Sequence, residues 1–215
     1  MGKKSFKLIA GVVIGSSFLF ANTSLIDRCF NGGESACKKL YKNKILFSQL
    51  EERCLKKGEG KACLIIGNIF KVTGSREEVT EFISQGEDAC KKGNGGACVS
   101  VGILYFYGKK VPKDYTKAVE FFKKSCEMGD GLGCTSLGMM YKKGKGVSKN
   151  STKAIELFKE GCDLKEGLGC YNLGYMYAKG KGVPKNYTKA KELYKKACDL
   201  GVEEGCKNLK SMEEE

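Results

Sequence analysis

Twelve cysteines recur in a regular order along this 215-residue chain, and their spacing constrains the fold more than any other feature. Taken two at a time, they lie 8 residues apart in five pairs and 9 residues apart in the sixth. From Cys54 onward, the first cysteine of each pair recurs every 36 residues. A fixed period of this size is typical of a solenoid, in which short units of one structure stack side by side. The cysteines are Cys29, Cys37, Cys54, Cys63, Cys90, Cys98, Cys126, Cys134, Cys162, Cys170, Cys198 and Cys206.

Each full unit predicts two helices joined by a glycine-rich turn. In the unit that begins at Cys170, residues of one face recur at helical spacing: Cys170, Leu173, Gly174 and Tyr177. The segment Gly-Lys-Gly at 180–182 ends this first helix, and Asn186 is a suitable N-cap for the second. Asp114 and Asn150 occupy the same place in the two preceding units. We therefore expect an all-α fold, an α/α solenoid of helix hairpins.

A glycine recurs four residues after the cysteine that opens each unit: Gly67, Gly102, Gly138 and Gly174. Glycine inside a helix costs about 1 kcal/mol relative to alanine, so a compensating contact is expected. We expect each glycine to allow close approach of the second helix at its recurring alanine: Ala118, Ala154 and Ala190.

The N-terminus predicts export. Residues 1–21 combine a basic start at Lys3, Lys4 and Lys7 with a short apolar run and a small residue, Ala21, which is the pattern of a signal peptide. A retained anchor is the alternative, although the run is short for a membrane span. Removal of three lysines lowers the net charge from +13 to +10. An even number of cysteines in an exported chain indicates disulfides, in the periplasm or outside the cell.

Counting favours one pairing of the cysteines. Linking near neighbours uses all twelve and joins the second helix of one unit to the first helix of the next. Linking the two helices within a unit, as in Cys170 with Cys198, leaves Cys29 and Cys206 without partners. We favour the first scheme, in which each short loop contributes about 2.5 kcal/mol by the chain-entropy relation.

Several classes of site are excluded or disfavoured. The chain has no histidine, which excludes histidine-based zinc sites and Ser-His-Asp triads. It has no Cys-x-x-Cys motif either, so we expect no metal and no cofactor. Basic residues alternate with Glu120, Glu156 and Glu192, which favours a solvated face over a nucleic-acid site. We expect a monomer without stable membrane insertion after cleavage.

The residues of the repeat also resemble a known family. The unit CYNLGYMYAKGKGVPKNYTKAKELYKKACDLG resembles the Sel-like repeat, a relative of the tetratricopeptide repeat. With the cysteine pairs and the leader, the chain is similar to the secreted cysteine-rich proteins of Helicobacter. The resemblance implies a right-handed superhelix bridged at its junctions. We expect a signal peptide at 1–21, a degenerate repeat at 22–62, four repeats at 63–206 and a C-terminal cap or tail at 207–215.

The resemblance implies two functions. Sel-like repeats bind proteins or peptides, whereas members of the cysteine-rich family are catalogued as beta-lactamases or penicillin-binding proteins. Serine beta-lactamases use S-x-x-K together with S-D-N and K-T-G. Here S-x-x-K occurs once, from Ser35 to Lys38, and the other two motifs are absent. A catalytic Ser35 assisted by Lys38 is therefore a weak candidate, and an ordinary surface serine is the favoured interpretation.

A binding surface is the preferred hypothesis. First helices line the concave groove of tetratricopeptide-like solenoids. The positions two and five residues after the cysteine are not needed for the core of the unit, and they carry Ser100, Ile103, Ser136, Met139, Asn172 and Tyr175. The alternative is that these side chains pack between adjacent units. We expect an exported scaffold that binds a protein or peptide, with a host or envelope partner; beta-lactam binding and a purely structural envelope role are the alternatives.

Overall fold

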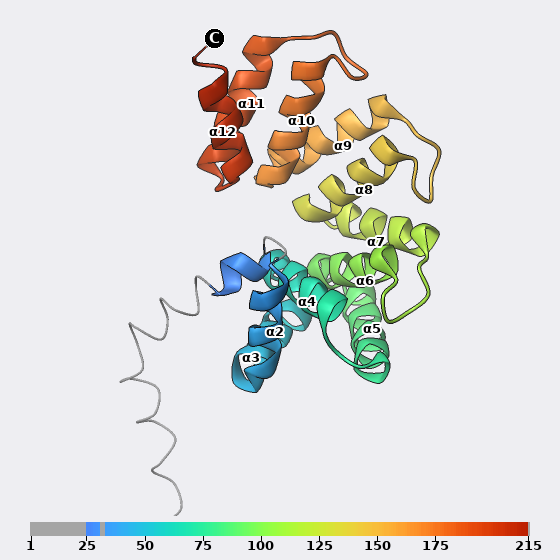
Figure 1. Cartoon of the computed structure of the whole chain (residues 1–215). Coiled ribbons are helices and arrows are strands. Elements are labelled where there is room, and N and C mark those ends of the chain that lie inside the picture. The colour runs from blue at the N-terminus through green and yellow to red at the C-terminus, as the bar shows by residue number, and fades with distance from the viewer. Residues whose placement is uncertain (1–24, 31–32, 215) are drawn as a thin grey trace, which may run out of the picture.

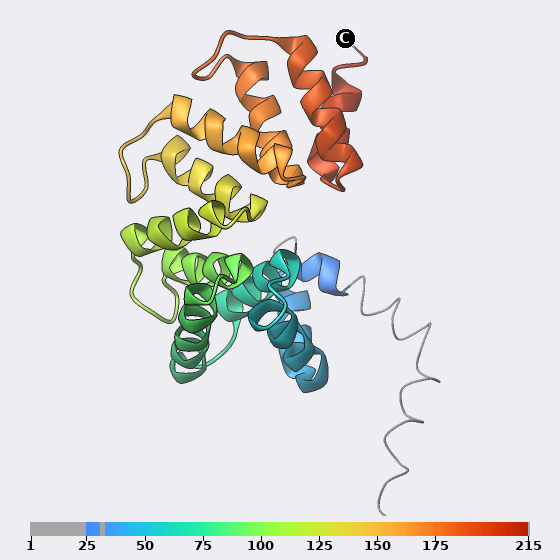
Figure 2. The ribbon, with the colours of Figure 1, turned by 180° about the vertical axis from the view of Figure 1, so that it is seen from behind.

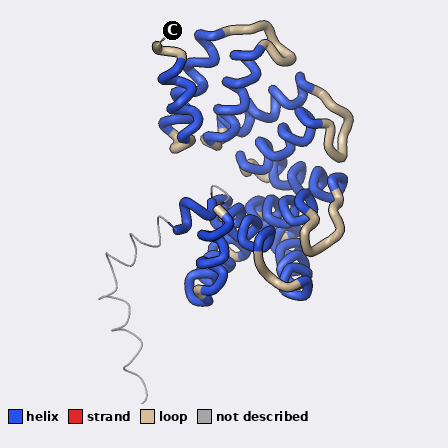
Figure 3. The backbone as a smooth tube through the Cα atoms, viewed as in Figure 1, coloured by secondary structure: helices blue, strands red, loops and turns tan. Residues whose placement is uncertain are grey.

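The computed structural model describes residues 25–30 and 33–214, and these residues form helices joined by turns, with no strand among them (Figure 3). The predicted signal peptide at 1–21 lies outside the described residues. After a helical segment at 25–30, the helices are α2 (Glu34–Lys42), α3 (Lys44–Leu55), α4 (Gly60–Val72), α5 (Arg76–Lys91), α6 (Gly95–Tyr107), α7 (Tyr115–Glu127), α8 (Gly131–Lys143), α9 (Ser151–Asp163), α10 (Gly167–Lys179), α11 (Tyr187–Asp199) and α12 (Glu203–Ser211).

The helices stack as hairpins along a curved array that ends at α12 (Figures 1 and 2). Within the hairpins, α6 packs on α7, α8 on α9 and α10 on α11. Neighbouring first helices also pack on one another, from α4 through α6 and α8 to α10. Neighbouring second helices instead pack mainly on first helices. First helices therefore form the closely spaced inner row of the solenoid, as the repeat pattern predicts.

Six disulfides hold the junctions between units, and their pairing is the one that the spacing favours. The bonds are Cys29–Cys37, Cys54–Cys63, Cys90–Cys98, Cys126–Cys134, Cys162–Cys170 and Cys198–Cys206. From Cys54 onward, each bond joins the last turn of a second helix to the first turn of the following first helix. Each staple therefore fixes the angle between two consecutive units.

The ends of the helices follow from local sequence. The side chains of Asp114, Asn150 and Asn186 each accept a hydrogen bond of 2.9 Å from the backbone N–H three residues later, which confirms them as N-caps. At the other end, α10 stops where Gly180 adopts a φ of 63°, a left-handed conformation that glycine takes without strain.

The recurring glycines make room for aromatic rings, rather than for the alanine alone. A Cβ atom on Gly138 would lie 2.7 Å from Phe158, and one on Gly102 would lie 2.6 Å from Phe122. At Gly174 the corresponding ring is Tyr194, at 3.1 Å. Each ring lies one helical turn beyond the predicted alanine contact. The expectation of close helix approach is therefore confirmed, but its main partner is the ring.

The first part of the solenoid departs from this plan. Helix α4 packs closely on α2, α3 and α6, whereas its backbone makes little contact with α5. Gly67 lies against Ile103 of the following unit, 2.9 Å from where its Cβ would be, and not against a ring of its own unit. The core here is filled by side chains such as Phe70 and Phe82, whose ring centroids are 5.1 Å apart.

Within the described ranges, no helix combines the length and the apolar character that crossing a bilayer requires.

Candidate interaction surface

The inner row of helices carries a half-buried polar surface on α8 and α10, which we call the α8–α10 face. It consists of Ser136, Met139 and Lys142 from α8 and Asn172 and Tyr175 from α10. Four of these residues were predicted from the repeat pattern, and Lys142 was not. They come together because α8 and α10 are adjacent first helices that pack on one another, while the Cys162–Cys170 staple ties α10 to α9, the second helix of the α8 hairpin.

Lys142 is the centre of this face. Its Nζ lies 3.4 Å from Oδ1 of Asn172 and 4.6 Å from the centroid of the Tyr175 ring. The Asn172 amide nitrogen donates to the carbonyl of Leu168 at 2.8 Å, which fixes the orientation of the side chain. Lys181 lies 5.1 Å from the centroid of the same ring and donates to the Tyr175 hydroxyl at 3.0 Å. The face therefore presents oriented polar groups and two cations around one aromatic ring.

Burial and like charges act on these groups. Burial lowers the pKa of Lys142, and the positive charges of Lys143 and Lys181 lower it further. The hydrogen bond from Lys181 lowers the pKa of the Tyr175 hydroxyl, with further contributions from neighbouring lysine charges. Burial is the main cause of the Lys142 shift, whereas the lysine charges that act on both groups show that several cations lie close together here.

Two of the predicted surface residues are in the core instead. Ser100 is 0% exposed and Ile103 is 6% exposed. Ser100 donates to backbone carbonyls of its own helix and lies 3.4 Å from Sγ of Cys54, while Ile103 covers Gly67. The prediction that Ser100 and Ile103 meet a partner is wrong, because α4 packs closely on α6 and covers this end of the inner row.

The weak catalytic candidate is not assembled into a reactive pair. Ser35 and Lys38 are both exposed on α2, and no hydrogen bond joins their side chains. Ser35 lines a shallow hollow with Arg28 and Lys39, whereas Lys38 does not. A serine nucleophile needs a base within hydrogen-bonding reach, so this arrangement gives Ser35 no activation of that kind.

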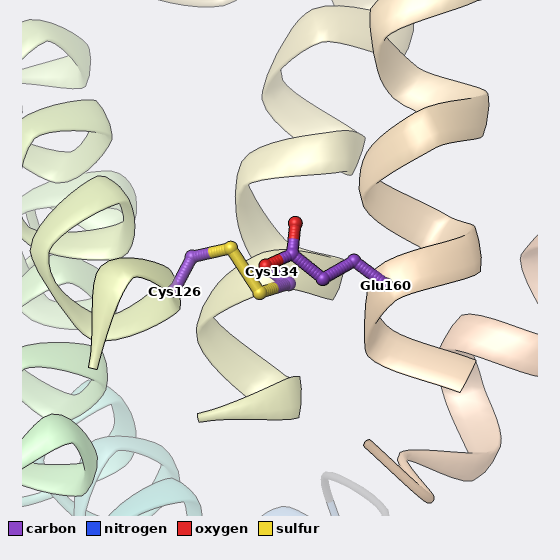
Figure 4. Close-up of side chains that lie close together, drawn as sticks. All are labelled: Cys126, Cys134 and Glu160. Atoms are coloured by element: carbon purple, nitrogen blue, oxygen red, sulfur yellow. A yellow bond between two sulfur atoms is a disulfide. The ribbon is translucent and has the colours of Figure 1, made fainter. Parts of the chain in front are cut away.

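One cluster brings together residue types that bind metals. The Glu160 carboxylate of α9 lies beside the sulfur atoms of Cys126 and Cys134 (Figure 4). Those two sulfurs are bonded to each other, and zinc sites are built from thiolates. The exposed carboxylate is then the one anionic ligand of the three, which does not fit a metal site.

The Sel1 repeat pattern matches residues 96–130, 132–166 and 167–202. Cysteine-rich protein B of Helicobacter pylori is 32% identical, and the match covers 63% of this chain and 98% of that one, with a TM-score of 0.53. The chain belongs to the Sel1 repeat family. Among curated protein sequences, none matches it.

Two further Sel1 structures are similar. A Sel1 repeat protein from Oxalobacter formigenes is 26% identical over 62% of this chain and 98% of its own length, with a TM-score of 0.53. A protective antigen of uropathogenic Escherichia coli is 28% identical over 77% of this chain, with a TM-score of 0.59. The match spans 36% of that longer structure, so these Sel1 repeats correspond to only part of it.

The repeat pattern does not single out Lys142 as a surface residue. Lysine stands eight residues after the cysteine in this unit but is replaced by Ala178 in the next, so no period marks it. Its role depends on the rotation between α8 and α10, which brings it over Tyr175. Such contacts between units are set by the stacking of Sel1 repeats, not by the sequence of one helix.

Proposed function

We propose that the protein is an exported, disulfide-stapled scaffold that binds a protein or peptide partner on the α8–α10 face. The observation that carries this proposal is the group formed by Lys142, Asn172 and Tyr175, which is accessible yet held in place by contacts between two repeats. Sel1 repeats suggest protein interaction in general, and this face is where the chain offers oriented hydrogen-bonding groups beside aromatic area.

Rigidity supports binding by a preformed surface. Cys126–Cys134 ties α8 to α7 and Cys162–Cys170 ties α10 to α9, which restrains both helices of the face within the array before a partner binds. A binding site that is already ordered loses less conformational entropy on association, so more of the interaction free energy remains as affinity. The staples also favour an oxidising location, the periplasm or the exterior of the cell.

The alternative function is binding or slow hydrolysis of beta-lactams, and the structure gives it less support than the binding of a protein or peptide. The described residues show no hydrogen bond between Ser35 and a base, and its helix α2 lies in the N-terminal part of the array, away from α10 (Figure 1). A chromogenic cephalosporin assay on the oxidised protein is the matching test. Rapid turnover that Ser35→Ala abolishes would replace the binding proposal with the enzymatic one.

The decisive experiment is affinity capture from envelope fractions and host-cell extracts with the oxidised protein as bait. The test variant is Met139→Ala with Asn172→Ala, because both residues are half-buried on the α8–α10 face. The control variant is Ser84→Ala with Thr80→Ala on the outer surface of α5. We expect one partner, identified by mass spectrometry, to be depleted by the test variant and retained by the control.

Loss of capture with both variants, or with neither, would contradict the choice of surface. Absence of any partner under oxidising conditions would instead favour a structural role in the envelope. The unmodified protein distinguishes these outcomes: it captures a partner if only the choice of surface is wrong, and it captures none if the role is structural.

A further inference from the structure

The solenoid ends in an open cleft beside the α8–α10 face. It lies between α10, the loop that follows it, α11 and α12, at the C-terminal end of the array (Figure 1). The cleft has a volume of about 480 Å³, and its lining includes Tyr171, Tyr175, Tyr187, Tyr194, Lys179 and Lys185. Its lining contains four tyrosines and two lysines but no carboxylate. The second helices of the repeats, by contrast, carry glutamates such as Glu120 and Glu156 among their lysines.

The cleft lies where a tyrosine has less cover than its equivalents in earlier repeats. Two repeats earlier, Tyr115 is half-buried under the following loop, where Lys145 lies 4.9 Å from its ring centroid and 3.3 Å from its hydroxyl. Tyr187 has the same position in the last full repeat, and no such loop covers it, so it is 54% exposed. Helix α12 has 9 residues, whereas α10 has 13, and the shorter helix leaves the surface of α10 partly uncovered.

Positive charge gathers around this cleft without an internal partner. The basic cluster consists of Lys142, Lys179, Lys181 and Lys185, and none of these four forms a salt bridge with a described carboxylate. The nearby acid Glu213 pairs with Lys191 instead, at 3.8 Å. Lys142 and Lys181 both lie against the Tyr175 ring. Lys185 lies 4.4 Å from the centroid of the Tyr187 ring. An anionic ligand would relieve this repulsion.

We propose that the cleft binds an extended acidic peptide segment that carries an apolar or aromatic side chain between its carboxylates. The lysines of the basic cluster pair with the carboxylates, while the tyrosine rings, Ala178 and Met212 receive the apolar side chain. The lining mixes polar groups with these apolar surfaces. The apolar contacts suit a peptide side chain, and an anionic polysaccharide of the same charge is the competing ligand in the test. The inference deepens the proposed function and rests on it, since it names the chemistry of the partner segment.

The test is fluorescence anisotropy with a labelled ten-residue peptide that alternates Glu with Phe and Leu, on the oxidised full chain. The test variant is Lys179→Gln with Lys185→Gln, two exposed lysines that line the cleft. The matched control is Lys143→Gln with Lys149→Gln, exposed lysines at the same places one repeat earlier. Both variants remove two charges, so a general charge effect cancels between them.

We expect the test variant to weaken binding about five- to tenfold and the control less than twofold, with affinity falling as ionic strength rises. Equal losses in the two variants, equally tight binding of a peptide with Lys in place of Glu, or tighter binding of polyuronate would overturn the inference. No binding of the acidic peptide would also overturn it. The proposed function would survive each of these results if capture of a partner still depends on Met139 and Asn172.

Discussion

The recurring glycine of the first helix provides the sharpest test of how the repeats pack. Replacing Gly138 with alanine places a Cβ 2.7 Å from Cε1 of Phe158 and 3.3 Å from the carbonyl oxygen of Ala154. Ordinary contacts between carbon atoms are near 3.5–4.0 Å, so one of the two groups must move. Phe158 is 0% exposed, so neighbouring side chains surround its ring and must shift with it.

The expected size of the effect follows from two opposed terms. Alanine in place of glycine favours the helix by about 1 kcal/mol. Overpacking of a rigid core costs about 1–3 kcal/mol. We expect Gly138→Ala to lower the free energy of unfolding by about 1 kcal/mol, as the balance of these terms. Gly174→Ala is the matched comparison, because the Tyr194 ring there is 3.1 Å away and borders the open cleft.

Urea unfolding of the oxidised protein, followed by circular dichroism, measures both variants. Phe158→Leu provides the second arm of a double-mutant cycle, since a smaller side chain gives the new methyl group room. Gly138→Ala should cost less in the Phe158→Leu background than in the natural one, and Gly174→Ala should be nearly neutral. Stabilisation by Gly138→Ala, or additive costs in the cycle, would refute the packing role of the glycine.

Two other substitutions are suggested by residues that differ between equivalent repeat positions. Burial disfavours the ionised carboxylate of the Asp130 N-cap and so raises its pKa. The cost of burying this charge lowers the free energy of unfolding at neutral pH, and the cost is relieved as the pH falls through the folded-state pKa. Asn94 makes the same cap without charge and donates to two carbonyls at 2.8 and 2.9 Å. Asp130→Asn should therefore raise the free energy of unfolding near neutral pH, and this advantage should shrink in urea titrations repeated at acidic pH; a constant advantage would contradict the linkage. The buried Ser125 hydroxyl has no hydrogen-bond partner, and Ala89 stands at the same position, so Ser125→Ala should stabilise by about 1 kcal/mol in thermal unfolding; a loss would show that the hydroxyl has a partner.

The sequence predicts contacts within a unit well, because its period reports the same local environment several times. The N-caps at Asp114, Asn150 and Asn186 and the glycine stop at 180 all follow from residues a few positions apart. The staple pairing follows as well, since its loops are too short to depend on how the units are rotated.

Contacts between units were harder to predict. Ser100 and Ile103 stand at the same repeat positions as Asn172 and Tyr175, yet only the latter two reach the surface. The difference arises from α4, which packs on α6 in the irregular first part of the solenoid, and a repeat pattern averages over such departures. The terminal cleft was missed for a related reason, because periodicity does not show what the end of an array leaves uncovered.

The central claim is that covalent staples at successive junctions fix the geometry of the solenoid, and peptide mapping without reductant tests it most directly. Trypsin combined with a glutamate-specific protease can cut inside every staple loop, since each contains a target: Glu34, Lys56, Lys91, Glu127, Lys165 and Glu203. The account predicts six linked peptide pairs, each joining cysteines 8 or 9 residues apart. Free thiols in the protein purified under oxidising conditions, or links such as Cys170 to Cys198 within a hairpin, would contradict it.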